Sequence, residues 1–190
     1  MTSIQLFWLI LGISWALVEL AIALKTRVKL DGLSLLEYRS ERLIWLVVAV
    51  ALSLALWVKT LHWAALPIKL FDRQLIAVIL FLSGLALRFY AVFSLGKFFS
   101  TSVRINPTHQ LIVHGPYLFV RHPAYTGLFV SFFAAGFAMG DALALLTLIC
   151  PVAYVLSQRI QIEEQWLSSH FGKSYVDYSL RTKKLLPWIY

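Results

Sequence analysis

The side chains best suited to chemistry lie in residues 115–127, which read GPYLFVRHPAYTG, and in the acidic pair Glu163-Glu164 further along the chain. In the first segment, Arg121 and His122 alternate with tyrosine and phenylalanine. Aromatic rings of this kind wall an adenine, while arginine and histidine donate hydrogen bonds to a ribose or a carboxylate. We therefore interpret the segment as half of a cofactor site; a solvated loop between helices is the plainer alternative.

The second group of reactive side chains lies on a predicted helix that continues past the last long apolar segment, within residues 154–180. Arg159 and Glu163 are spaced i and i+4, so they share one face of that helix. Trp166 and His170 continue this face. Beside it run the apolar Ile160, Leu167 and Phe171, and Gly172 is the predicted end. An ordinary surface ion pair is the alternative, but charged groups at a membrane boundary are more often functional.

Other kinds of site find little support. His109, His114 and His122 lie near the first segment, but their spacing matches no helical metal pair and no carboxylate stands among them, so we expect no metal. Cys150 is the single cysteine, which excludes an intrachain disulfide. No GxG pattern occurs, so a nucleotide-like cofactor must be bound by something other than a Rossmann fold or a P-loop.

The composition indicates that membrane helices position these residues. The chain is 60% hydrophobic and only 14% charged, with a mean hydropathy of +0.77. Such a chain has too few charges to cover a soluble surface, and a membrane helix needs about 20 mainly apolar residues. We predict an all-α integral membrane protein of 1–190 as one domain, with about five transmembrane helices. The predicted spans are 4–24, 43–64, 74–96, 124–140 and 142–158.

The basic residues between these spans predict the orientation. Thirteen Lys and Arg residues fall on one side of the five spans and three on the other, with Arg88 inside the third. An excess of basic residues marks the cytoplasmic side, so residues 97–123 and the C-terminal amphipathic helix are predicted to lie there. The net charge of +8 comes without a basic run, so nucleic acid is not an expected partner.

Two further charges fall within the predicted spans. Glu19 and Arg88 cannot face lipid cheaply, so they face the helix bundle or a wet cavity. We expect them to pair with one another or with backbone groups, or to extend toward the membrane surface. A contact between Arg88 and a substrate carboxylate is the second hypothesis.

At these motifs the chain resembles the isoprenylcysteine carboxyl methyltransferase family and the related membrane phospholipid methyltransferases. The resemblance covers roughly residues 96–187 and looks closest to the compact prokaryotic members. Its motifs are HQLIVHGPY at 109–117, RHPAYTG at 121–127, RIQIEE at 159–164 and FGKSYVDY at 171–178. Taken in this order they are fairly specific, whereas sterol-reductase-like membrane enzymes carry a pattern similar to RHPxY. Residues 1–96 are then N-terminal spans, and 97–190 form the catalytic half.

The resemblance implies that S-adenosylmethionine binds between the loop and the helix after the last span. Glu163 matches an acidic cofactor contact and Arg159 a substrate-side arginine, and these two are the implied catalytic residues. The other implied cofactor contacts are His109, Gln110, Leu111, Ile112, Tyr117, His122, Pro123, Ala124 and Tyr125.

The expected reaction is methylation of a carboxylate on a lipophilic, isoprenylcysteine-like acceptor, either a small molecule or a lipidated substrate that arrives from the membrane lipids. A carboxylate is already ionised and needs no base, whereas an amine or phospholipid acceptor would need Glu163, Glu164 or His122 as one. An NADPH-dependent reductase and a membrane scaffold or small transporter are the alternatives. The expected site faces the cytoplasm, at the cytoplasmic membrane of a prokaryote or the endoplasmic reticulum of a eukaryote.

Overall fold

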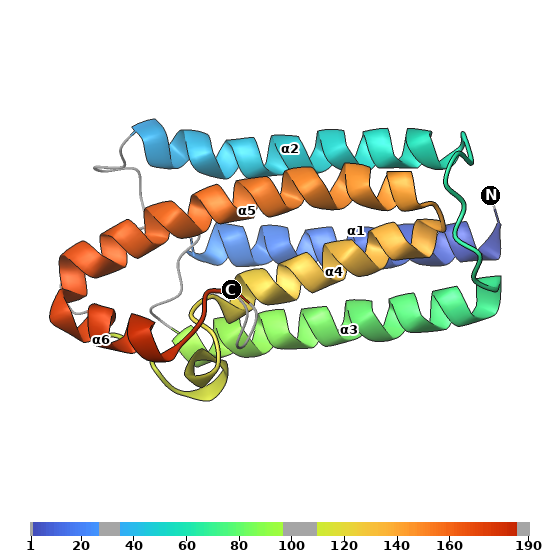
Figure 1. Ribbon diagram of the computed structural model, residues 1–190. Coiled ribbons are helices and arrows are strands. Elements are labelled where there is room, and N and C mark those ends of the chain that lie inside the picture. Colours follow the sequence, from blue (N-terminus) through green and yellow to red (C-terminus); the bar gives the residue numbers. More distant parts are fainter. Residues whose placement is uncertain (1, 27–34, 97–109, 186–190) are drawn as a thin grey trace.

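The computed structural model of the chain describes residues 2–26, 35–96 and 110–185, and nearly all of this described part is helical (Figure 1). The predicted all-α fold is confirmed. Five long helices coincide with the five apolar segments. One short helix lies in the loop before the fourth long helix, and another follows the fifth. They are α1 (Ser3–Thr26), α2 (Leu35–Lys59), α3 (Leu70–Leu95), η2 (Gly115–Leu118), α4 (Pro123–Met139), α5 (Ala142–Phe171) and α6 (Lys173–Arg181).

Three of these helices, α1, α3 and α5, are long and apolar enough to cross a membrane. The apolar parts of α2 and α4, Leu43–Lys59 and Pro123–Met139, are shorter. The chain is therefore an integral membrane protein, and the count of five spans stays a prediction.

Two helix boundaries differ from the prediction. The segment predicted as 43–64 begins earlier, at Leu35, and ends at Lys59. It ends there because the chain turns: the Thr60 amide donates to the carbonyl of Trp57 at 2.9 Å, and His62 has a φ of 54°. The helix that contains the predicted span 142–158 runs on to Phe171 as expected, and Gly172 follows it with a φ of 52°.

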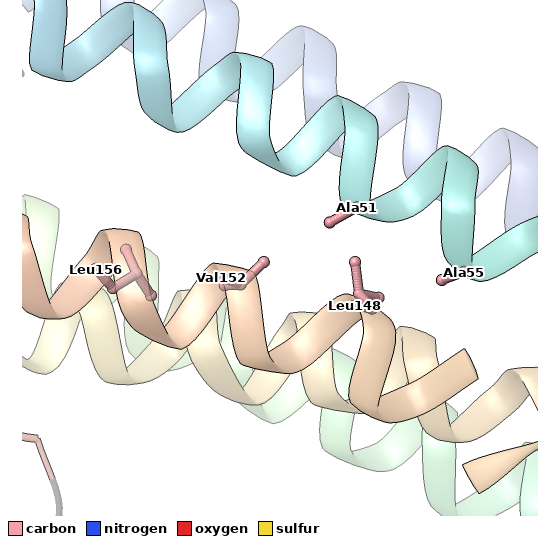
Figure 2. Packing of buried hydrophobic residues seen from close by; sticks show 5 residues of the cluster. All are labelled: Ala51, Ala55, Leu148, Val152 and Leu156. Atoms are coloured by element: carbon pink, nitrogen blue, oxygen red, sulfur yellow. The ribbon is translucent and has the colours of Figure 1, made fainter. Parts of the chain in front are cut away.

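The long helices pack as two pairs, α2 with α5 and α3 with α4, and α4 also packs against α5 (Figure 1). Figure 2 shows the first pair, in which Ala51 and Ala55 of α2 face the larger Leu148 and Val152 of α5. In lipid, helices associate through close packing rather than through the hydrophobic effect, so small residues at the contact bring the two backbones together.

The second pair depends on glycine at its crossing point. A Cβ on Gly127 of α4 would lie 2.5 Å from the carbonyl oxygen of Gly84 and 2.6 Å from the amide nitrogen of Arg88 in α3. Neighbouring Ser131 donates to the carbonyl of Gly127 at 3.0 Å. This close approach fixes α4, and hence the loop before it, against α3.

Helix α1 contacts the rest of the bundle through a few long side chains. Trp8 donates to the Oε1 atom of Gln74 at 2.6 Å and meets Phe81 edge-on, with ring centroids 5.6 Å apart. Trp15 contacts Phe81 and Phe132 in the same region, at centroid distances of 5.4 and 4.9 Å. These contacts connect α1 to α3 and α4.

The two ends of the bundle differ in character. At the end that holds the N-terminus, the Asp141 carboxylate caps α5 by accepting from the Ala144 amide at 2.9 Å, and it also accepts from the Ala64 amide at 2.9 Å. At the opposite end, η2, the start of α4, the end of α5 and α6 come together (Figure 1). The two motifs singled out in the sequence therefore meet at one end of the molecule.

Candidate functional site

A cavity of about 1110 Å³ lies between α1 and the two helix pairs, and residues of the loop and α6 line one of its ends. Its length is lined mainly by apolar side chains, including Trp8 of α1, Leu52 of α2 and Phe132 of α4. Polar side chains line the end where α5 and α6 meet, which we call the polar end, and others, such as Gln5, Lys59 and Arg73, line the opposite end. A long chamber with an apolar middle and polar side chains at its ends suits an amphipathic ligand.

Three of the predicted residues meet at this polar end. The Tyr125 hydroxyl lies close enough to the side chains of both Arg159 and Glu163 to interact with each. Because arginine only donates and a carboxylate only accepts, the hydroxyl can accept from Arg159 and donate to Glu163. Arg159 is buried, and all three side chains line the cavity. Arg159 and Glu163 thus share one face of α5, as their spacing predicted.

Tyr117 forms a second part of the wall. It is buried beside Ala91 and Ala124, with Ile112 against the same cluster, and its hydroxyl donates to the carbonyl of Ala91 at 3.4 Å. Burial, followed by the nearby negative charge of Glu163, raises the pKa of the Tyr117 phenol well above its usual value of 10.0. Tyr117 is therefore a neutral hydrogen-bonding group at any ordinary pH.

Most of the residues predicted to contact a cofactor line the cavity. His109 lies outside the described residues. Pro123 is fully buried and does not line the cavity; it begins α4, where its fixed φ and missing N–H fit the first helical position. The predicted residues that do line it are Gln110, Leu111, Ile112, Tyr117, His122, Ala124, Tyr125, Arg159 and Glu163.

The second residue of the acidic pair has different partners. Glu164 accepts from Nε of Arg121 at 2.8 Å, lies 3.4 Å from Nε2 of His122 and pairs with Nζ of Lys184 at 3.0 Å. A span that starts at Ala142 crosses the roughly 30 Å apolar core within about 20 residues, so Glu164 lies beyond it. We call Glu164 with these three partners the clasp.

The electrostatics of the clasp favour the ionised carboxylate. Burial is the largest single effect and opposes ionisation, but hydrogen bonds from His122, Lys184 and Arg121 together outweigh it and lower the pKa of Glu164 to about 2. Glu164 is therefore a weak base, which leaves Glu163 and His122 as the base candidates if an acceptor requires one.

The two charges within the bundle pair with one another. Glu19 of α1 and Arg88 of α3 form a two-point ion pair, with Arg88 Nη2 3.0 Å from Oε2 and Arg88 Nε 3.1 Å from Oε1 of Glu19. Trp15 donates to the same carboxylate at 3.2 Å. Pairing of this kind was among the expected arrangements, and both residues line the cavity.

Some cavity-lining residues were not predicted as site residues. Trp166, Leu167 and Phe171 of α5 line the cavity, although the sequence indicated only that Trp166 continues the Arg159–Glu163 face and that Leu167 and Phe171 run beside it. Tyr175 and Tyr178 of α6 line it too. Their i, i+3 spacing in the FGKSYVDY motif is the signal that could have placed them on one helix face.

Comparison with known proteins gives consistent family matches. Residues 77–169 match the sequence model of the isoprenylcysteine carboxyl methyltransferase (ICMT) family. The chain is 31% identical over 122 residues to a probable protein-S-isoprenylcysteine O-methyltransferase of Oryza sativa subsp. indica, covering 60% of this chain and 61% of that protein. It is 34% identical over 108 residues to the Schizosaccharomyces pombe protein-S-isoprenylcysteine O-methyltransferase, covering 56% of this chain and 46% of the relative.

A solved structure shares the fold. The eukaryotic intramembrane Ras methyltransferase ICMT superposes with a TM-score of 0.63 at 25% sequence identity, over 76% of this chain and 52% of that one. The chain therefore spans less than two thirds of the length of these relatives.

Proposed function

We propose that this chain, whose residues 77–169 match the isoprenylcysteine carboxyl methyltransferase family, transfers a methyl group from S-adenosylmethionine to the carboxylate of a lipophilic acceptor within the membrane. The observation that supports this most directly is the meeting of Tyr125, Arg159 and Glu163 at the polar end of a long apolar cavity. A cation-binding carboxylate and an anion-binding guanidinium thus lie side by side. Methyl transfer between a sulfonium and a carboxylate needs both kinds of group.

The cofactor would bind at the polar end of the cavity, between the loop and α5. S-adenosylmethionine supplies an electrophilic methyl on a positively charged sulfur. The donor set fits its parts: the Glu163 carboxylate suits a cationic amino group, while Tyr117, Tyr125 and Ile112 offer aromatic and apolar walls for an adenine. His122, which is buried, would place its ring along the same wall.

Arg159 would bind the acceptor. A guanidinium holds a carboxylate through two parallel hydrogen bonds, which fixes the direction of the attacking oxygen. The neighbouring Tyr125 hydroxyl would help to orient that guanidinium, and Arg159 is 5% exposed, so little water competes for it. Positioning of this kind lowers a barrier by up to about 7–11 kcal/mol when alignment is ideal.

No general base is required for a carboxylate acceptor. The raised pKa of Tyr117 keeps its phenol protonated, so it donates a hydrogen bond rather than removing a proton. The residues named here therefore bind, orient and exclude water.

The apolar part of the cavity suits the lipid portion of the acceptor. Its lining by α1, α2 and α4 side chains gives an isoprenoid-like chain an apolar environment inside the bundle. We propose that the acceptor enters sideways from the bilayer, and that the polar end faces the cytoplasm because the basic residues gather at this end.

The test of the cofactor proposal is calorimetry of the detergent-purified protein with S-adenosylhomocysteine, repeated on Glu163→Ala and His122→Ala. The wild type should bind, and both variants should bind more weakly. Asp177→Asn, which changes an exposed acidic residue of α6, is the matched control and should bind as the wild type does. Absence of binding heat from the wild type would refute the cofactor assignment.

A further inference from the structure

The segment that follows α6 lies alongside the cofactor loop. We call residues 182–185 the strap. Beside it, the Arg121 amide donates to the carbonyl of Lys183 at 2.8 Å, and the His122 amide donates to that of Lys184 at 3.0 Å. The Thr126 hydroxyl donates to the carbonyl of Leu185 at 2.7 Å. The loop backbone thus gains partners from a part of the chain about 60 residues away in sequence.

The side chain of Arg121 extends this connection to α6. Its Nη1 donates to the carbonyl of Ser179 at 2.8 Å and to the carbonyl of Thr182. These carbonyls lie at the C-terminal end of α6, where a helix leaves acceptors unsatisfied and favours a positive charge. Arg121 therefore caps α6 while its Nε binds the Glu164 carboxylate of α5.

Glu164 joins all these parts. Its Oε1 is shared by Arg121 and His122 of the loop, and its Oε2 pairs with Lys184 of the strap. Successive residues of a helix point about 100° apart, so one turn of α5 directs Glu163 into the cavity and Glu164 to the clasp. The two carboxylates of the acidic pair thus have separate tasks.

We propose that Glu164 is a positioning residue, which holds Arg121 and His122 of the loop, the start of α4 and the strap in the register that a cofactor needs. The inference rests on the proposed function, and the residue acts through His122 and Tyr125 rather than on the cofactor itself. His122 lines the cavity while its Nε2 faces Glu164, so the carboxylate fixes the ring. Tyr125 lies in the first turn of α4, and the hydrogen bonds from His122 and Thr126 to the strap hold the start of this helix.

The contacts of Glu164 indicate that it holds the loop and the strap and does not stabilise the packing of the helix pairs. The groups that face Glu164 are Arg121, His122 and Lys184, with Tyr175 of α6 close enough to feel its charge. Three of them belong to the loop and the strap, and none belongs to the α2–α5 or α3–α4 packing. Loss of the carboxylate should therefore loosen the loop and the strap and leave the bundle intact.

The test compares Glu164→Gln, Glu164→Asp and the control Asp177→Asn in the full-length detergent-purified protein. Hydrogen exchange at the Arg121 and His122 amides is measured without cofactor, and S-adenosylhomocysteine affinity by calorimetry. Glu164→Gln should speed exchange at these amides and weaken binding about tenfold, as expected when a hydrogen bond to a charged group is lost. Glu164→Asp, which keeps the charge, should recover part of both, and Asp177→Asn neither.

The hydrogen-exchange and calorimetry measurements test this inference separately from the proposed function. Unchanged exchange and binding in Glu164→Gln would overturn the positioning role, as would faster exchange spread evenly over all helices. A wild type that binds no S-adenosylhomocysteine would count against the cofactor proposal alone, because the exchange arm still decides whether Glu164 holds the loop.

Discussion

The Tyr125 hydroxyl lies beside the Glu163 carboxylate, which brings the first turn of α4 against the end of α5. The two residues lie 38 positions apart in the sequence and come from the two motifs that stood out there. Arg159 reaches the same hydroxyl from one turn earlier in α5. One phenol therefore connects the proposed cofactor side of the site with the proposed acceptor side.

Tyr125→Phe should impair both sides of the site. Removing the hydroxyl takes away a polar group that lies beside both Glu163 and Arg159, and a net hydrogen bond contributes about 0.5–1.5 kcal/mol. We expect weaker S-adenosylhomocysteine binding and a higher KM for the acceptor, each by a factor of about 3 to 10. Calorimetry and initial rates measure the two effects. A cofactor affinity and an acceptor KM equal to those of the wild type would show that the Tyr125 hydroxyl contributes to neither side of the site.

Arg159→Lys should raise the KM for a carboxylate acceptor about tenfold or more, because lysine keeps the charge but lacks the planar two-point donor geometry. Binding of S-adenosylhomocysteine, measured in parallel, should change little. If instead cofactor affinity falls and acceptor KM is unchanged, Arg159 belongs to the cofactor side.

Glu19→Leu should destabilise the protein strongly. It leaves the buried Arg88 guanidinium without its carboxylate, and breaking a buried ion pair costs about 3–5 kcal/mol. The double variant Glu19→Leu/Arg88→Leu removes the orphaned charge and should unfold at a higher temperature than Glu19→Leu alone. Thermal unfolding in detergent gives the ranking, with the exposed Leu17→Ala on α1 as the control. If the double variant unfolds at no higher temperature than Glu19→Leu, the broken ion pair is not the cause of the destabilisation.

Gly127→Ala should lower stability by roughly 1–3 kcal/mol, since overpacking at a helix contact forces the backbones apart. The added Cβ would lie 2.5 Å from the Gly84 carbonyl oxygen, whereas one on Gly12 of α1 has nothing within 4 Å. Gly12→Ala is therefore the matched control and should be neutral. Equal unfolding temperatures for the two variants would contradict the close α3–α4 crossing.

The clasp makes a prediction about pH. The pKa of Glu164 is lowered from its usual 4.5 to about 2, so the folded state favours the ionised form. Its stabilisation is complete above about pH 4.5 and is lost as the pH falls toward 2. The difference in unfolding free energy between wild type and Glu164→Gln should thus shrink as the pH falls from about 4.5 toward 2. A difference in unfolding free energy that grows on acidification would contradict the lowered pKa of Glu164.

Much of the site followed from local spacing. The i, i+4 relation of Arg159 and Glu163 predicted a shared face because a helix has a fixed repeat, and the apolar segments predicted the helices. The meeting of this face with RHPAYTG was predicted from charge counting and the family motifs.

The clasp escaped prediction because its partners come from distant parts of the chain. Arg121 and Glu164 are 43 residues apart, and no local spacing indicates that Glu164 meets Arg121, His122 and Lys184. The end of α2 was misplaced for a related reason: residues 60–64 are apolar enough to continue a span, but tertiary hydrogen bonds at Ala64 hold them in a turn.

The most direct test of the proposed function is transfer of labelled methyl from S-adenosylmethionine to an isoprenylated cysteine by the purified protein, with the product treated with mild base. We predict label on the acceptor as a base-labile methyl ester, formed by the wild type and lost in Glu163→Ala and Arg159→Ala. Label that resists base, on an amine or a lipid headgroup, or no transfer at all from a protein that binds S-adenosylhomocysteine, would contradict carboxyl methylation.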